Sequence, residues 1–131
     1  MSAHRGLSTY RQTQVQSRTP LELVVMLYDG ALKFLHLTRA AIERRDVAAR
    51  RDASSRALAI ISELQSTLNM AEGGEIAERL DALYAFASAR ILQSAHENAA
   101  APLDDAIRVI ETLRESWVSI AAPAEAVRGA A

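Results

Sequence analysis

The chain has 131 residues, half of them apolar, and a formal net charge of −1. This length supports one compact domain with a substantial core, and the near balance of acidic and basic residues argues against a nucleic-acid partner. Because the chain has no cysteine, neither a disulfide framework nor a thiolate metal site is possible. The N-terminal segment has no apolar run resembling a signal-peptide core, and no segment approaches the ~18 consecutive apolar residues of a membrane span. We therefore expect a cytoplasmic protein without stable membrane insertion.

Helix-forming residues dominate the chain between sparse glycines and prolines, which predicts an all-α fold. Residues 1–18 are polar apart from Leu7, Tyr10 and Val15. We expect this segment to be a mobile N-terminal arm or a short docked helix. Such an arm would cover an apolar groove until a partner displaces it; the alternative is a terminus that simply packs against the domain.

The first long helix has a clear start signal. Thr19 is the expected N-cap, Pro20 fits the first helical position because its missing N–H needs no partner there, and Glu22 completes a capping box. We expect this helix to continue to about Arg45. Gly30, in its middle, costs about 1 kcal/mol relative to alanine, which predicts that another backbone approaches closely there.

This first helix is apolar over a wide arc. At 100° per residue its polar positions share one narrow strip, which leaves an apolar arc of roughly 240°, against ~100° for an ordinary surface helix. One interpretation makes it the central helix, covered on two sides by the others. A second interpretation gives part of the arc to a groove that binds an amphipathic helix of another protein. The predicted partner contacts are then Tyr10 and Val15 in the arm and, on the helix, Leu21, Val25, Tyr28 and Leu32.

Three more helices are expected. The second runs from near Asp46 to Leu68, and the glycine pair at residues 73–74 should end it by supplying left-handed backbone. A third helix follows that pair, and Pro102 opens the fourth. Short links between four helices predict an antiparallel four-helix bundle over residues 19–120, followed by a disordered tail over residues 121–131.

The expected core of these helices follows from apolar residues that recur at helical spacing. In the second helix they are Ala57, Ile61, Leu64 and Leu68. In the third they are Ile76, Leu80, Leu83, Tyr84, Ala87 and Ile91. In the fourth they are Leu103, Ala106, Ile107, Ile110, Leu113, Trp117 and Ile120.

The sequence shows no sign of catalytic chemistry, so we expect no enzyme activity, no cofactor and no metal site. His4, His36 and His96 are far apart, and none belongs to a metal-binding pair. His36 leaves one alternative open, a histidine phosphotransfer bundle in which this side chain accepts a phosphoryl group. Such domains typically have a lysine and then a glycine after the histidine, whereas the residues that follow His36 here, Leu37-Thr38-Arg39-Ala40, keep only the basic character. A structural bundle that self-assembles is a further alternative.

Several motifs together resemble one known family. Thr19-Pro20 is followed by MLYDGA at residues 26–31 and by GGEIA at residues 73–77. LRE at residues 113–115, with Trp117, completes the pattern. With Tyr10 and Val15 in the arm, this pattern over roughly residues 8–120 is similar to the FliS family of flagellar secretion chaperones. The chain departs from the family at three positions, where a small residue, an aspartate and a second tyrosine are common. These are Arg18, Asn69 and Phe86.

The resemblance implies a cytoplasmic export chaperone for newly made flagellin. In this family the disordered C-terminal segment of flagellin wraps around the bundle and forms helices in its apolar grooves. Binding prevents premature polymerisation and keeps the flagellin competent for flagellar type III export. The resemblance also implies handover to the export-gate protein FlhA, and contact with a flagellin-level regulator. Helix-in-groove recognition with folding coupled to binding needs no chemical step.

Overall fold

The computed structural model describes residues 19–121, and the predictions made for the arm and for residues 122–131 lie outside this part. The described part consists of four helices without strands. They are α2 (Pro20–Glu43), α3 (Val47–Ser66), α4 (Met70–Glu97) and α5 (Ala100–Ala121). The prediction of an all-α helical bundle is confirmed.

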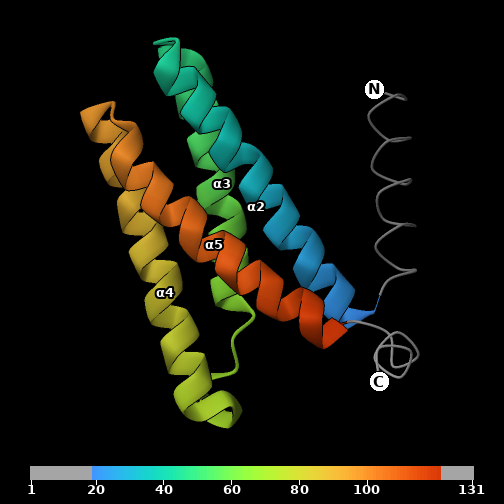
Figure 1. The fold of residues 1–131 in the computed structure, drawn as a ribbon. Helices are drawn as coiled ribbons and strands as arrows, with labels where there is room; N and C mark the ends of the chain where they lie inside the picture. Colours follow the sequence, from blue (N-terminus) through green and yellow to red (C-terminus); the bar gives the residue numbers. More distant parts are fainter. Residues whose placement is uncertain (1–18, 122–131) are drawn as a thin grey trace, which may run out of the picture.

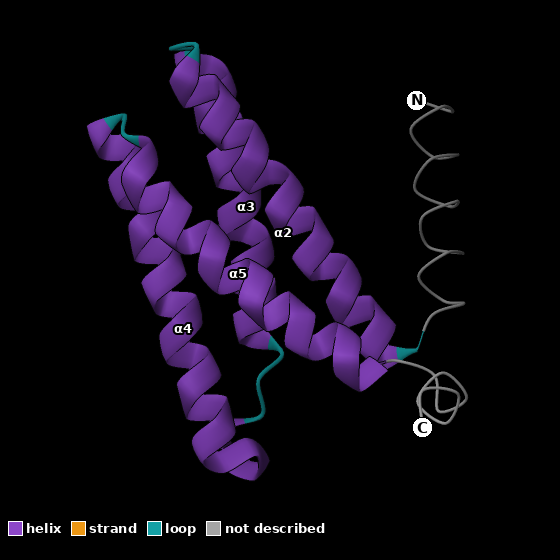
Figure 2. Cartoon of the chain, viewed as in Figure 1, coloured by secondary structure: helices purple, strands orange, loops and turns teal. Residues whose placement is uncertain are grey.

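Consecutive helices run in opposite directions and are joined by short links (Figures 1 and 2). Helix α2 packs against α3 and α5, and α4 packs against the same two helices, so the four helices surround one core. The α2–α3 and α4–α5 turns lie at one end of the bundle. The start of α2, the end of α5 and the α3–α4 link lie at the other end (Figure 1), which we call the open end.

The start of α2 has the predicted capping box. The Thr19 hydroxyl accepts a hydrogen bond from the Glu22 backbone N–H at 3.1 Å, and the Thr19 N–H donates to the Glu22 carboxylate at 3.4 Å. The helix ends at Glu43, two residues before the predicted end. There Arg45 adopts a positive φ of 58°, which breaks the helical backbone and starts the turn into α3.

The predicted role of the glycine pair is wrong. Helix α3 ends at Ser66, before the glycines, and Asn69 starts a new helix because its side chain accepts from the Glu72 N–H at 3.1 Å. Both glycines therefore lie inside α4. Gly74 has φ 52° and ψ −130°, a conformation that glycine tolerates, and it kinks α4 after one turn.

Two smaller expectations also change. Helix α5 begins at Ala100, so Pro102 lies within its first turn rather than at its first position; this turn suits proline because its N–H groups have no helical partner. Gly30 does not meet another backbone. A Cβ atom at Gly30 would instead lie 3.2 Å from Cδ1 of Ile60 on α3, so a side chain occupies the space that the glycine leaves.

The core is deepest in the middle of the bundle. Helix α2 contributes Tyr28, Ala31 and Leu35, each 0% exposed, as the central-helix interpretation predicts. Most of the predicted core positions on α3, α4 and α5 are also buried. Toward the open end the same stripes emerge into solvent, since Ile76 is 71% and Ile120 is 63% exposed.

Candidate functional site

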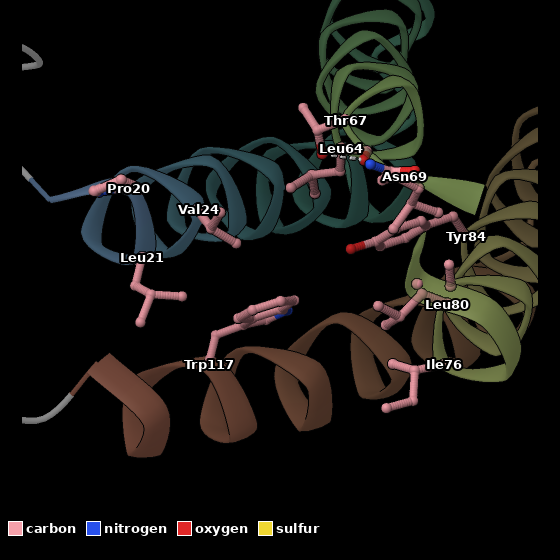
Figure 3. Close-up of a pocket in the computed structure, with 13 residues that line it drawn as sticks. Pro20, Leu21, Val24, Leu64, Thr67, Asn69, Ile76, Leu80, Tyr84 and Trp117 are labelled. Atoms are coloured by element: carbon pink, nitrogen blue, oxygen red, sulfur yellow. Dashed lines mark hydrogen bonds between the residues drawn. The ribbon is translucent and has the colours of Figure 1, made fainter. Parts of the chain in front are cut away.

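An apolar groove occupies the open end of the bundle, where all four helices contribute side chains (Figure 3). Its volume is about 370 Å³. We call it the open groove. It is lined by Pro20, Leu21 and Val24 of α2, Leu64 of α3, the link residues Thr67, Leu68 and Asn69, then Gly73, Ile76, Ala77, Leu80 and Tyr84 of α4, and Trp117 of α5.

Local features of the chain position the two walls of this groove. On one side the Thr19 capping box fixes the first turn of α2, which carries Leu21. On the other side the kink at Gly74 sets the direction of the first turn of α4, whose Gly73 lines the groove. Figure 3 shows Trp117 of α5 between these walls. The open groove therefore depends on a helix cap and on a glycine.

A chain of hydrogen bonds links the aromatic residues of three helices at this groove. The Trp117 indole N–H donates to the Tyr28 hydroxyl at 3.0 Å, and the Tyr28 and Tyr84 hydroxyls share a hydrogen bond of 2.5 Å. Tyr28 is 0% and Tyr84 is 1% exposed. Burial raises the pKa of both phenols, and the Tyr84 contact raises the pKa of Tyr28 further. Both phenols are therefore neutral at physiological pH, with their hydroxyls already hydrogen-bonded.

Two further hollows lie along the sides of the bundle. One, of about 370 Å³, lies between α2 and α3 and is lined by Leu23, Met26, Leu27 and Glu63. The other, of about 230 Å³, lies between α4 and α5 and is lined by Leu83, Arg108, Val109, Thr112 and Leu113. Each exposes mainly apolar side chains. With the open groove, they distribute apolar surface around the bundle rather than in one patch.

The four helix residues predicted to contact a partner occupy different environments. Leu21 lines the open groove. Val25 and Leu32 are partly exposed, and Leu32 also packs against the core. Tyr28 has no exposed surface in this structure because α4 and α5 cover it. Tyr10 and Val15 lie outside the described residues.

Several residues of the open groove were assigned to the core or not singled out from the sequence. Ile76, Leu80 and Trp117 share the apolar stripes of their helices, which gave no reason to separate them from buried positions. The available signal was their place near helix ends, where an antiparallel bundle offers fewer neighbours. Val24 also belongs to the broad apolar arc of α2, but it is not among the four helix positions predicted to contact a partner.

Ion pairs fix α5 against its two neighbours. Arg39 of α2 pairs with Asp104, and Arg90 of α4 pairs with Asp105 at 2.6 Å. Hydrogen bonds from these guanidinium groups hold the pKa of both carboxyls below its usual value. Asp29 and Arg114 form another pair between α2 and α5. These contacts hold in place the helix that carries Trp117.

His36 lies on the outer surface of α2, away from the open groove. Its side chain is 58% exposed, and its Nε2 atom is 3.8 Å from Oε1 of Glu111. A carboxylate beside the ring would repel an incoming phosphoryl group. Over residues 19–121 no group of acidic or histidine side chains could hold a metal ion. Among those residues, no helix combines the length and apolar character needed to span a membrane.

Comparison with known proteins identifies the family. The family model described as "Flagellar protein FliS" matches residues 3–124. The chain belongs to the FliS family. The resemblance inferred from sequence motifs is thus confirmed, and this membership favours a chaperone over a phosphotransfer bundle.

Named relatives from several bacteria agree with this assignment, and each is called a flagellar secretion chaperone FliS. The protein of Vibrio cholerae is 35% identical over 119 residues, which cover 88% of each chain. That of Salmonella typhimurium is 34% identical over 120 residues, covering 88% of this chain and 89% of the relative. That of Bacillus subtilis is 32% identical over 117 residues, covering 89% and 86%. This FliS chain therefore aligns with its relatives over nearly its whole length.

Proposed function

We propose that this FliS chain is a cytoplasmic export chaperone that binds the disordered C-terminal segment of flagellin. Binding keeps flagellin from polymerising prematurely and keeps it competent for flagellar type III export. The observation that carries the proposal is the open groove of about 370 Å³, an apolar site in a member of a flagellar secretion chaperone family.

The energetics require more than one groove. Ordering a disordered segment costs about 1–2 kcal/mol per residue, whereas burial of apolar area returns ~25 cal/mol per Å². A client can meet this requirement only by burying many side chains, each at an already formed apolar surface. The two lateral hollows extend the apolar surface beyond the open groove. This mechanism needs no catalytic residue, cofactor or metal ion.

Client contacts on α2 are proposed at Leu21, Val25 and Leu32. Leu21 lines the open groove, and the other two are partly exposed on the same helix. Tyr28 supports these contacts from the core rather than touching the client. Ile76 joins the proposed contact surface because it lines the open groove while being 71% exposed.

The arm is proposed to cover the open groove before the client binds, with Tyr10 and Val15 as its apolar contacts. The arm joins the bundle at Thr19, next to the groove residue Pro20. It has three arginines and no acidic residue, whereas acidic side chains surround the open end. They include Glu22, Glu63 and Glu72. This opposite charge supports a docked arm that a client displaces.

Export would continue through two further partners. We propose handover of the client to the export-gate protein FlhA, and contact with a flagellin-level regulator of the kind that some family members meet. Support for both partners comes from the family resemblance. Neither requires insertion of the chain into a membrane or contact with nucleic acid.

The proposal is tested by titrating a fluorescently labelled peptide, the C-terminal segment of the same organism's flagellin, with the purified protein and following anisotropy. A scrambled peptide serves as the control. Ile76→Ser should weaken binding by about tenfold or more, because a full apolar side chain contributes about 1.5–3 kcal/mol on burial. Leu92→Ser is the matched control and should leave binding unchanged. Leu92 is 57% exposed on the same helix but does not line the open groove. Equal binding of both peptides, or no binding by a protein shown to be helical by circular dichroism, would contradict the proposal.

A further inference from the structure

We propose that Tyr28 is a positioning residue that makes the open groove selective for aliphatic client side chains over hydroxylated ones of the same shape. This inference rests on the proposed function, because it concerns what the groove of a chaperone accepts. Tyr28 has no exposed surface, so it would act through the residues that line the groove and not by touching the client.

The relevant geometry is the position of one hydroxyl between two aromatic residues of the groove. Figure 3 shows Tyr84 and Trp117 reaching into the open groove from α4 and α5. The Tyr28 hydroxyl accepts from Trp117 Nε1 at 3.0 Å and lies 2.5 Å from the Tyr84 hydroxyl. The only polar side-chain atom of each lining aromatic residue is therefore bonded to the same buried group.

The other polar side chains in the described lining are also occupied. The Thr67 hydroxyl donates to the Leu64 carbonyl at 2.7 Å. The Asn69 side chain accepts from the Glu72 N–H at 3.1 Å and donates to the Glu72 carboxylate at 3.2 Å. Each of the four polar lining side chains thus has a partner within the chain. Thr67 and Asn69 are exposed and keep some bonding capacity toward solvent, whereas the polar atoms of the two aromatic residues are both engaged by the buried Tyr28 hydroxyl.

This arrangement predicts discrimination against a client hydroxyl. A threonine that replaces a valine in the groove would give up its hydrogen bonds to water without gaining equivalent ones from the chain. Pockets of this apolar kind reject a hydroxylated isostere by up to about 10²-fold. We expect the groove to prefer valine to threonine by about 10- to 100-fold at the client position that it binds.

Removal of the Tyr28 hydroxyl would change this preference through Trp117. In Tyr28→Phe the indole N–H and the Tyr84 hydroxyl both lose the Tyr28 hydroxyl as their partner. Water can satisfy the N–H while the groove is empty, but an apolar client excludes that water and leaves a buried donor without an acceptor. A client hydroxyl could accept from the same N–H. The variant should therefore lose affinity for the valine peptide and tolerate threonine better.

The test compares labelled flagellin C-terminal peptides in which one valine at a time is replaced by threonine, using anisotropy as before. The wild type should identify at least one position with the 10- to 100-fold preference. At that position Tyr28→Phe should bind the valine peptide about tenfold more weakly and prefer it to threonine by less than about threefold. Thr38→Val is the matched control, because it removes another buried hydroxyl of α2, one that donates to the Phe34 carbonyl at 2.7 Å and does not line the open groove; its preference should stay near the wild-type value.

Several outcomes would overturn the inference. The inference is wrong if Tyr28→Phe keeps the wild-type preference for valine. A merely structural role of Tyr28 predicts this result, because affinity for both peptides would then fall equally. In the triple variant Tyr28→Phe with Trp117→Phe and Tyr84→Phe both groups that lose their partner are gone, so the preference for valine should return. If these variants do not fold, the indole N–H of wild-type Trp117, the only tryptophan, should remain protected from solvent exchange by nuclear magnetic resonance with and without the peptide. Rapid exchange in the bound state would contradict the inference. A wild type that binds no peptide would instead contradict the proposed function and this inference with it.

Discussion

The guanidinium of Arg39 on α2 forms a two-point contact with the carboxylate of Asp104 on α5. Arg39 Nε donates to Oδ1 at 2.7 Å and Nη2 donates to Oδ2 at 3.3 Å. The two residues are 65 positions apart in the sequence, so this pair joins the first described helix to the last. The pair lies toward the far end of α2 and α5. At the open end, the same two helices carry Leu21 and Trp117 in the open groove.

Acid should selectively weaken this contact. The hydrogen bond from Arg39 lowers the pKa of Asp104 in the folded protein, whereas the unfolded chain has the ordinary value of about 3.9. Its stabilisation is therefore complete above the unfolded pKa and is lost as pH falls through the folded pKa. We expect the free energy of unfolding of Asp104→Asn to lie slightly below that of the wild type at pH 7. The difference should vanish in strong acid. Urea unfolding at several pH values measures this difference, and a gap that does not change with pH would contradict the account.

The central role of α2 predicts very different effects for two leucines on that helix. Leu35 is 0% exposed and Leu37 is 48% exposed. Leu35→Ala should lower the free energy of unfolding by about 2–5 kcal/mol because it leaves a cavity in the core. Leu37→Ala should change it by no more than about 0.5 kcal/mol. Chemical denaturation measures both values, and similar losses would show that α2 is not buried on the face described.

The capping box at Thr19 should matter for binding as well as for stability. Thr19→Ala and Asp46→Ala each remove the side-chain cap of a helix, and each should cost about 1 kcal/mol. Thr19 holds the turn that carries Leu21, whereas Asp46 lies at the α2–α3 turn, at the far end of the bundle. Only Thr19→Ala should weaken binding of the flagellin peptide beyond the effect of lost stability. Equal weakening by the two variants would show that the first turn of α2 does not shape the site.

The kink in α4 should depend on glycine at position 74. Its φ of 52° with ψ of −130° is strained for any residue with a Cβ atom, although no atom would contact that Cβ. Gly74→Ala should therefore lower the free energy of unfolding by about 1–3 kcal/mol through backbone strain alone. Thermal and urea unfolding test this expectation. A variant as stable as the wild type would indicate that the first turn of α4 continues the helix without a kink.

Local signals in the sequence predicted the fold well where neighbours in the chain decide the structure. The Thr19 capping box is an interaction between residues three positions apart, so the sequence alone contains it. The spacing of Ile61, Leu64 and Ile91 likewise identified helix faces that are buried. The glycine pair misled because Asn69, which with Glu72 three residues later forms a helix-start signal of its own, caps a new helix before the glycines.

The open groove could not be read from the sequence because periodicity identifies a helix face but not the extent of its coverage. Ile76 and Ile91 share a stripe on α4, yet one is 71% exposed and the other is 0% exposed. Ala77, the residue after Ile76, is only 4% exposed, so the buried face of α4 reaches this level and Ile76 lies at its edge. Tyr28 illustrates the same limit on α2. The apolar arc of that helix is broad, and periodicity did not show that Tyr28 is buried while other positions of the arc are accessible.

We propose that apolar grooves of this FliS chain bind a flagellin segment that folds as it binds. Isothermal titration calorimetry of the protein with the flagellin C-terminal peptide, repeated at several temperatures, tests it most directly. We expect one-to-one binding with a clearly negative heat-capacity change, the signature of apolar burial. Binding with no heat-capacity change, or no heat at any temperature from a folded protein, would contradict it.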